Sequence, residues 1–563
     1  MRPSLLLPFL FLSCWLFGQG PEPSRLYEFG KRVQVDHAAV ASAHPEATRV
    51  GIEVLRRGGN AFDAAIAVQL ALAVVYPRAG NLGGGGFMVA RCADGRALSY
   101  DYREMAPARA ARNMYLDAEG KPIADLSVRG GLAAGVPGTV SGLFSMHAHA
   151  VLPFTELIEP AIALAEKGFC LTAGDAASLN RYQEVFASTN NHVPAFVKVG
   201  GWKKGDRLVQ PELAQTLRRI RDGGREGFYE GETARLLAEQ MRAGGGIIDE
   251  ADLKAYATKP RPVLRFSYKG YQLLSMGPPS SGGTCLAELM GITAQFPLEK
   301  YGFHRPQTVH LMVEAERRAY ADRAAHLGDP DFWPVPTGLL SPAYWAERAA
   351  EIDPQKATPS TGVAAGDFEG EQTTHLSVLD AEGNAVSVTT TLNSNYGCKV
   401  VVKGAGFFLN NEMDDSSIKP GVPNQFGLVG AEANAIQPGK RMLSSMTPTI
   451  VLDSTGKVKM VVGTPGGATI ITSVFQVVHN VLTFGMNLSE AVNAPRFHHQ
   501  WLPDQIFIEK NALPKATVKA LEAMGHKIVV RENIGLVDAI LVHENGRIEA
   551  VGDDRGDDAA AGY

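Results

Sequence analysis

Cysteine is scarce in this sequence, and the scarcity excludes two classes of site. The 563 residues include only five cysteines, one of which, Cys14, lies in an apolar N-terminal segment. The other four lie far apart and include no CxxC pair, so they form neither a disulfide framework nor a zinc site. We expect these four to be buried thiols: Cys92, Cys170, Cys285 and Cys398.

A strong charge of one sign is also missing. The chain carries 54 lysines and arginines against 59 aspartates and glutamates, a net charge of −5 at pH 7. No global positive field is therefore present to attract nucleic acid. We expect the partner to be a small molecule or a protein, and no nucleic acid.

Only one stretch has a long run of apolar residues, and it stands at the N-terminus. Arg2 precedes LLLPFLFLSCWLFG, after which the chain turns polar with QGPEPS. A positive start followed by a short apolar segment is typical of a secretory signal, which we place at residues 1–20. The run is too short to span a bilayer, and Pro8 interrupts it. We expect an exported, periplasmic or extracellular protein; a lipoprotein anchor at Cys14 remains the alternative.

The rest of the chain alternates helical and strand patterns, without internal repeats or low-complexity blocks. Residues 45–76 have helical periodicity with a break at Gly58-Gly59-Asn60. Helical patterns return at 155–166, 211–222, 231–243, 284–296, 307–327, 470–484 and 514–524. Short β-branched runs begin at residue 374 and include HLSVLD, NAVSVTTTL, GAGFFLN, PTIVLD and VKMVVG, with KIVVRE, DAILVH and RIEAVGD near the end. The sequence therefore predicts a mixed α and β fold whose C-terminal third is rich in strands.

Two threonines, Thr373 and Thr374, lie at the start of the first of these strands. The runs HLSVLD and AVSVTTTLN flank AEGN, so Glu382-Gly383 is a plausible hairpin turn. Folding about that turn puts Thr373 opposite Thr391 or Leu392, at the roughly 5 Å that separates cross-strand neighbours. Asn393 follows on the same face as Thr391. A slip of one residue in the pairing register of the two strands would place these side chains on the opposite face of the sheet.

Threonine becomes a nucleophile only beside a base, and the sequence shows no convincing Ser-His-Asp or Cys-His pairing. Cleavage of the bond between Gln372 and Thr373 would give Thr373 a free α-amine. The pKa of an α-amine is about 7.7–8.0, so this group can accept the hydroxyl proton near neutral pH. The alternative is that both threonines are ordinary strand formers.

Three further segments contain residues suited to a binding site, although none of the three is a specific motif when taken alone. Asn410–Asp415 (NNEMDD) is a carboxylate cluster, which is more typical of a solvated turn or a calcium site than of a substrate site. Residues 440–446 (KRMLSSM) form a loop with basic and hydroxyl side chains. Gly463-Thr464-Pro465-Gly466-Gly467 leads into a helix at Ala468, where glycine amides can bind an anion or simply connect strand to helix.

Taken together, the segments resemble the gamma-glutamyltranspeptidases (glutathione hydrolases), a family of N-terminal nucleophile hydrolases. The resemblance covers essentially the whole chain after residue 20. It rests on GGNAFDAAIAV, NLGGGGFM, REMAPA, AAGVPGTV, PPSSGG, AYADR with LGDPDFW, QTTHLSV, NNEMDDSS, KRMLSSMTPTI, GTPGGA, NAPRFHHQWLPD and the final AGY. It implies an α+β fold, the four-layer αββα sandwich of these hydrolases.

The resemblance implies a self-processing γ-glutamyltransferase and glutathione hydrolase. The precursor would cut itself between Gln372 and Thr373, giving a large subunit of residues 21–372 and a small catalytic subunit of residues 373–563 that fold as one unit and form a heterodimer. Thr373 would attack γ-glutamyl donors such as glutathione. The acyl group would pass to water, an amino acid or a dipeptide. No cofactor and no metal are implied.

The resemblance also implies roles for individual residues. Thr391 supports the nucleophile, and Gly466 and Gly467 donate to the oxyanion. The substrate's α-carboxylate is bound by Arg103, whose guanidinium can make two hydrogen bonds to it, and by Ser444 and Ser445. The α-ammonium is held by Asn393, Glu412 and Asp415.

Some positions depart from the family's pattern or leave alternatives open. Phe426 stands in the lid loop (PGVPNQFG) where the lid aromatic is often tyrosine, and Glu412 stands where some bacterial members have glutamine. For the adjacent His498 and His499 we expect a structural role, and His375 needs no catalytic role. The alternatives are a cephalosporin-acylase-like relative and an unprocessed, inactive surface protein that binds ligands.

Overall fold

The computed structural model describes residues 27–361 and 373–563. The expected signal at residues 1–20, Cys14 and Gln372 therefore lie outside the described residues. None of the helices within the described ranges is long and apolar enough to cross a membrane. Of the four cysteines expected to be buried, three are; the prediction was wrong for Cys170, which is exposed at the end of a two-residue strand.

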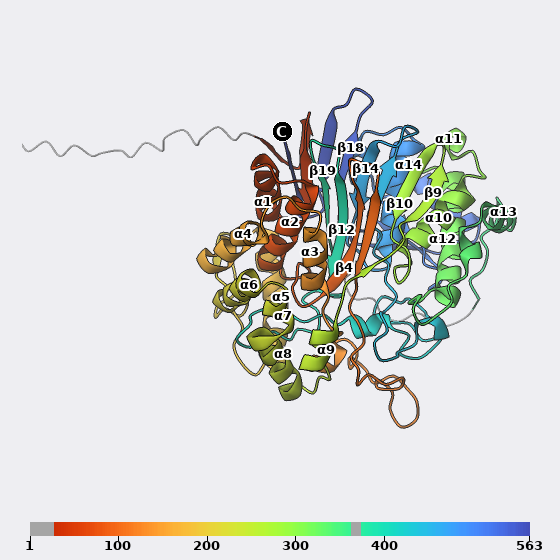
Figure 1. The fold of residues 1–563 in the computed structure, drawn as a ribbon. Coiled ribbons are helices and arrows are strands. Elements are labelled where there is room, and N and C mark those ends of the chain that lie inside the picture. The colour runs from red at the N-terminus through yellow and green to blue at the C-terminus, as the bar shows by residue number, and fades with distance from the viewer. Residues whose placement is uncertain (1–26, 362–372) are drawn as a thin grey trace, which may run out of the picture.

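Two large antiparallel sheets form the centre of the molecule (Figure 1). The first sheet has eight strands in the order β1 (Glu28–Gly30), β20 (Ala559–Gly562), β3 (Ala39–Ser42), β11 (Thr374–Leu379), β12 (Ala385–Thr391), β4 (Gly85–Arg91), β5 (Ala97–Tyr102) and β8 (Lys259–Pro260). The second has seven strands in the order β2 (Arg32–Val35), β19 (Ile548–Gly552), β18 (Asp538–Val542), β14 (Val458–Gly463), β13 (Thr449–Leu452), β10 (Tyr271–Ser275) and β9 (Leu264–Tyr268).

The two sheets pack face to face on an apolar layer that both contribute. Phe87 and Val89 of the first sheet meet Ile450, Val461 and Ile540 of the second. Because helices cover the outer faces, central strands such as β11 and β12 are buried on both sides along their whole length. This explains why their sequences are nearly continuous runs of apolar and hydroxyl residues without charged positions.

Helices form the two outer layers (Figure 1). Against the first sheet lie helices from the N-terminal part of the chain: α1 (Pro45–Arg56), α2 (Ala61–Val75), α3 (Thr139–His147), α4 (Phe154–Lys167), α5 (Ala173–Thr189), α6 (Pro211–Gly223), α7 (Glu226–Tyr229), α8 (Gly231–Ala243) and α9 (Glu250–Ala255). Beyond the second sheet lie α10 (Gly282–Thr293), α11 (Leu298–Tyr301), α12 (Pro306–His326), α13 (Pro342–Ala350), α14 (Thr469–Leu482), α15 (Leu488–Asn493) and α16 (Lys515–Ala523). The layer order is thus helix, sheet, sheet, helix, as predicted.

Two minor sheets complete the described part of the fold. One joins β15 (Phe497–His498), β16 (Ile506–Glu509) and β17 (Ile528–Arg531), and the other pairs β6 (Phe169–Cys170) with β7 (Arg207–Leu208). Strands on both sides of residue 372 contribute to each large sheet. The segments 27–361 and 373–563 therefore form one body with interleaved strands.

Local sequence explains the break between the first two helices, which the pattern predicted. Gly58 has φ of +94°, a conformation that L side chains rarely adopt, and it ends the first helix. Asn60 then caps α2: its side chain accepts from the N–H groups of Phe62 and Asp63, while Asp63 accepts from the Asn60 N–H. This reciprocal capping box fixes where α2 begins.

The prediction of a strand at GAGFFLN was wrong. Residues 404–410 make only isolated bridges, Val401 to Phe408 and Gly83 to Leu409. Gly404 and Gly406 have φ of +79° and +75°, so the backbone turns where an extended strand would continue. Several elements were not predicted, among them α3, α5 and the short alanine-rich strand β20.

Candidate active site

The hairpin of β11 and β12 places Thr373 beside Thr391. The strands pair Thr374 with Thr390 and Leu379 with Ala385, so the register continues to Thr373 opposite Thr391. The Oγ1 atoms of these two threonines lie 3.3 Å apart, and Thr373 is only 3% exposed. The cross-strand neighbour predicted from the turn position is confirmed.

Thr391 also fixes the chain that follows it. Its hydroxyl accepts a hydrogen bond of 2.8 Å from the N–H of Asn393, whose φ is +77°. Asn393 in turn donates from Nδ2 to the carbonyl of Asn411 at 3.0 Å. The left-handed backbone at Asn393 is thus held by side-chain contacts, and it directs the asparagine toward the segment with the acidic cluster.

Arg103 lies directly after β5 and is almost fully buried, with 1% of its surface exposed. Its Nε donates to the carbonyl of Met442 at 3.1 Å. Nη2 donates to Asp415 Oδ2 at 2.6 Å, and Nη1 lies 2.8 Å from Glu412 Oε2. Arg103 therefore bridges the carboxylates of the acidic cluster to the loop that carries the predicted serine pair.

The site holds more carboxyl groups than one guanidinium can neutralise. Glu412 is fully buried, and burial raises its pKa well above its usual value, although Arg103 opposes the shift. Glu104 lies 3.6 Å from Arg103 Nη1, and burial raises the pKa of Glu104 to about 8. A cationic group entering this cavity would lower both pKa values and stabilise the ionised carboxylates.

Ser444 and Ser445 are held by the segment PPSSGG and by α12. The carbonyl of Ser444 accepts from both the N–H and the hydroxyl of Ser281, and the Ser444 N–H donates to Pro279. Ser445 Oγ accepts a hydrogen bond of 3.2 Å from Nη2 of Arg323, whose Nε donates to Ser281 Oγ. The serine pair is thereby fixed against a second buried guanidinium.

The glycine turn before α14 completes the cavity. Gly466 and Gly467 have φ of +142° and +52°, and their carbonyls accept from the N–H groups of Thr469 and Ile470 in the first turn of α14. Only glycine adopts the first of these conformations readily. Gly467 lines the same cavity as Thr373, as does Phe426, whose carbonyl accepts from Gln500.

The structure therefore brings together most of the residues predicted from the sequence. A small cavity of about 20 Å³ is lined by Arg103, Thr373, Thr391, Asn393, Glu412, Asp415, Phe426, Ser444, Ser445 and Gly467. Gly466 instead lines a larger pocket on the other side of the glycine turn. The cavity combines a hydroxyl pair, one guanidinium and several carboxylates, which is the chemistry needed to bind a zwitterionic head beside a nucleophile.

Two charged residues at this site, Arg323 and Glu104, were not predicted from the sequence. Arg323 lies within AYADR, one of the segments that carry the resemblance, but nothing in its spacing indicated contact with Ser445 more than a hundred residues later. Glu104 follows Arg103 directly, and the sequence offers no signal that both side chains are buried together. Their environment arises from long-range packing.

The histidines lie apart from this cavity in the described structure. His375 is bonded to Thr389 and Ser377, and His498 to Thr472 and Gln500. Burial lowers the pKa of each to about 3, so each is neutral and structural at physiological pH.

A separate group of His310, Glu314 and His526 has ligand atoms within 4.8 Å of one another. His310 and His526 are hydrogen bonded to each other at 2.8 Å, and Glu314 is neutralised by Arg317 and Arg318. This charge balance favours a hydrogen-bonded network over a cation site.

Comparisons with known proteins agree with the geometry. The sequence profile described as Gamma-glutamyltranspeptidase matches residues 47–563. The glutathione hydrolase proenzyme of Escherichia coli (strain K12) is 46% identical over 539 residues, 94% of this chain and 93% of its own.

Two solved structures are also similar. The cephalosporin acylase from Bacillus halodurans superposes with a TM-score of 0.82 at 25% identity, covering 98% of this chain and 99% of its own. A chain of Helicobacter pylori gamma-glutamyltranspeptidase has a TM-score of 0.54 at 41% identity, and covers 56% of this chain and 92% of its own.

Proposed function

Because the chain belongs to the gamma-glutamyltranspeptidase family, we propose that it is a self-processing glutathione hydrolase and γ-glutamyltransferase. The observation that carries this proposal is the position of Thr373 Oγ1, 3.3 Å from Thr391 Oγ1, in a cavity shared with Arg103 and the acidic cluster. The relative at 46% identity bears the name of a proenzyme, which supports self-processing.

The charged groups of the cavity suit the head of a γ-glutamyl donor. The α-carboxylate would bind Arg103 with the hydroxyls of Ser444 and Ser445, and the α-ammonium would bind Asn393, Glu412 and Asp415. In the structure Arg103 forms ion pairs with Glu412 and Asp415. An incoming zwitterion would replace each internal ion pair by one of its own, so charge in the buried site stays balanced.

Thr373 would supply the nucleophile and the base in one residue. After the cut at Gln372 its α-amine takes the hydroxyl proton, and the oxygen attacks the γ-carbonyl. The N–H groups of Gly466 and Gly467 would stabilise the oxyanion, and the departing amine takes the proton. A γ-glutamyl ester of Thr373 results, which water or an acceptor amine then resolves.

Self-cleavage would leave two subunits that cannot easily separate. Strands β11, β12 and β20 come from residues 373–563, yet they lie between strands of residues 27–361 in the first sheet. Separating the subunits would break the ladders of β3 with β11 and of β4 with β12. We propose a heterodimer of residues 21–372 and 373–563, and export directed by residues 1–20.

A cephalosporin-acylase-like activity is the alternative, suggested by the similar Bacillus halodurans protein. That protein is 25% identical, whereas the glutathione hydrolase proenzyme is 46% identical over a similar share of the chain. Arg103 and the serine pair also match an α-carboxylate on the substrate. These observations favour a γ-glutamyl donor.

Substitution Thr373→Ala tests the proposal. Mass spectrometry should show the unsubstituted protein as two chains meeting at Gln372 and Thr373, and the variant as one uncut chain. The unsubstituted protein should hydrolyse a γ-glutamyl-anilide, and the variant should not. Two chains cut at residue 372 in the Thr373→Ala protein would refute the mechanism, and a single inactive chain without substitution would favour an unprocessed binding protein.

A further inference from the structure

The loop that follows Thr391 has an uncommon backbone. Residues 393–399 (NSNYGCK) directly continue the chain beyond β12. In this short stretch Asn393, Tyr396 and Lys399 have φ of +77°, +59° and +67°, in the left-handed region that L side chains rarely adopt. Such a backbone costs free energy and persists only where surrounding contacts hold it. The contacts that hold this loop therefore bear on the site that it borders.

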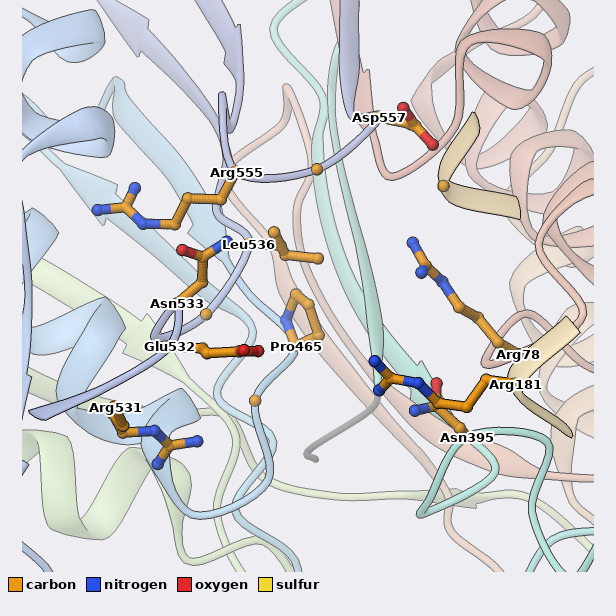
Figure 2. A pocket seen from close by; sticks show the side chains of 14 residues that line it. Arg78, Arg181, Asn395, Pro465, Arg531, Glu532, Asn533, Leu536, Arg555 and Asp557 are labelled. Atoms are coloured by element: carbon orange, nitrogen blue, oxygen red, sulfur yellow. The ribbon is translucent and has the colours of Figure 1, made fainter. Parts of the chain in front are cut away.

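The loop is part of the wall of the nucleophile cavity. Asn393 lines the cavity that contains Thr373, whereas Asn395 lines the larger pocket shown in Figure 2. On that far side Asn395 Nδ2 donates to the hydroxyl of Tyr182 on α5 at 3.2 Å. The shape of the loop between these two spaces decides where the amide of Asn393 stands.

A buried lysine binds this loop from within. Lys399 is only 5% exposed, although lysine is among the residues least often buried. Its Nζ donates to the carbonyl of Gly397 at 2.7 Å and to Oγ of Ser394 at 3.0 Å. The same ammonium lies 5.6 Å from the centre of the Tyr182 ring. Two of the three donors of the ammonium thus hold the loop in which the lysine itself lies.

The contact with Lys399 directs the hydroxyl proton of Ser394. Ser394 Oγ lies 3.0 Å from Asn411 Oδ1 and 3.2 Å from the carbonyl of Gly397. A hydroxyl has only one proton to donate, and the Gly397 carbonyl already accepts from Lys399. The proton of Ser394 is therefore directed to Asn411 Oδ1, which also accepts from the Ser394 N–H at 3.1 Å. Successive hydrogen bonds of this kind strengthen one another.

Asn411 connects this network to the proposed ammonium site. Its carbonyl accepts from Asn393 Nδ2 at 3.0 Å, and its N–H donates to the carbonyl of Leu392 at 3.1 Å. Because Nδ2 of Asn393 is held by the protein, Oδ1 is the amide atom that can accept from an ammonium. Asn411 also directly precedes Glu412 in the chain. The network that starts at Lys399 thus ends at two residues proposed to hold the α-ammonium.

We propose that Lys399 is a positioning residue for the ammonium side of the donor site. The inference deepens the γ-glutamyl function proposed above and rests on it. Lys399 is not among the described residues that line the cavity, so it acts through Ser394 and Asn411. It holds Asn393 with Oδ1 available to the α-ammonium. The ligands that depend on Lys399 are therefore donors and inhibitors with a free α-amine.

The effect of this network should be confined to the ammonium. Without Lys399 the proton of Ser394 is free to turn to the Gly397 carbonyl, and the left-handed loop loses two of its hydrogen bonds. Asn393 would then be held less firmly, and the donor would bind less tightly. Thr373 and Thr391 are placed by the pairing of β11 with β12, so a donor that has bound should react at the normal rate.

The test compares L-glutamate with glutarate, which lacks only the α-amino group, as inhibitors of γ-glutamyl-anilide hydrolysis by the processed protein. In the unsubstituted protein L-glutamate should bind about tenfold or more tighter than glutarate, because charge-assisted hydrogen bonds to the ammonium are strong. Lys399→Met keeps the length of the side chain and removes its donors. It should lower this preference by about 2- to 12-fold and raise KM of the donor by a similar factor, with kcat within about twofold. Lys399→Arg retains donors and should keep part of the preference.

Lys459→Met is the matched control. Lys459 is half-buried on β14, and its Nζ donates to the carbonyl of Val542 at 2.9 Å, so the same change removes a comparable bond. This variant should keep the full preference for L-glutamate. Ser394→Ala tests the network without removal of the lysine, and it should lower the preference as Lys399→Met does. If Lys399→Met gives no processed protein, Ser394→Ala and Lys399→Arg decide the outcome.

An unchanged preference in Lys399→Met and Ser394→Ala would overturn the inference, and so would an equal loss in Lys459→Met. A fall in kcat with an unchanged preference would show a general structural role of Lys399 and overturn it too. Failure of the unsubstituted protein to hydrolyse the anilide would instead overturn the proposed function, so the two failures are distinguishable.

Discussion

The contact between the two facing threonines gives a sharp test of the site. Substitution Thr391→Val keeps the volume and the β-branch of the side chain at the end of β12 but removes its hydroxyl. That hydroxyl accepts from the Asn393 N–H at 2.8 Å and lies 3.3 Å from Thr373 Oγ1. A buried N–H left without an acceptor costs about 1–3 kcal/mol, and loss of a neutral hydrogen bond about 0.5–1.5 kcal/mol.

These magnitudes predict two separate effects. The free energy of unfolding should fall by about 1–3 kcal/mol, through the lost acceptor for Asn393. Since about 1.4 kcal/mol corresponds to a tenfold change in rate, loss of the contact of about 0.5–1.5 kcal/mol with Thr373 should lower kcat by about 2- to 12-fold. The proposed self-cleavage should slow as well, because the hydroxyl of Thr373 would also attack the bond between Gln372 and Thr373.

The assay measures kcat on a γ-glutamyl-anilide, the rate of appearance of the two chains, and stability by denaturant titration. Thr389→Val is the matched control: it is the same change two residues earlier on β12, where the hydroxyl is bonded to His375 Nδ1 at 2.8 Å. The control should lose comparable stability and keep kcat within about twofold of normal. Equal loss of kcat in both variants would refute a specific role of Thr391 and indicate a general effect of strand destabilisation.

Three further substitutions test other parts of the site and core. Arg103→Lys keeps the charge but cannot reproduce the forked contacts of the guanidinium, so KM for the donor should rise about 10- to 100-fold in steady-state assays. Arg323→Met removes the donor to Ser445 and should raise the same KM about tenfold, with a smaller change in kcat. Burial raises the pKa of Glu288 well above 4.5, so the folded protein keeps a proton that the unfolded chain releases as pH rises. Glu288→Gln should therefore stabilise the protein more at pH 8 than at pH 5, by up to about 1.4 kcal/mol per pH unit, whereas exposed Glu522→Gln should show no such trend.

Short-range features of this protein were predictable from its sequence. The β11–β12 hairpin was predicted to within one residue of its register, because its turn is local and the strand period limits which residues face each other. The break at Gly58-Gly59-Asn60 likewise marked the start of α2, which begins at Ala61. In both cases the residues that determine the structure are neighbours in the chain.

Long-range and backbone-driven features were not predictable in this way. The contact of Arg323 with Ser445 depends on how α12 packs against a distant loop, which no spacing reveals. The segment at residues 404–410 has an apolar pattern, but Gly404 and Gly406 adopt φ values that only the folded context selects. Strand β20 was missed because its alanines lack the β-branched character by which strands are identified.

The position of β20 has a consequence for the timing of maturation. This strand contains the last residues of the chain, yet it lies between β1 and β3, and the carbonyl of Tyr563 accepts from the N–H groups of His37 and Ala38. β3 is also the partner of β11, which begins one residue after Thr373. The first sheet therefore closes only after residues 559–562 have been synthesised and inserted between β1 and β3. Under the self-cleavage proposed above, the cut at residue 372 would follow the synthesis of β20, and a chain that lacks this strand would remain uncut.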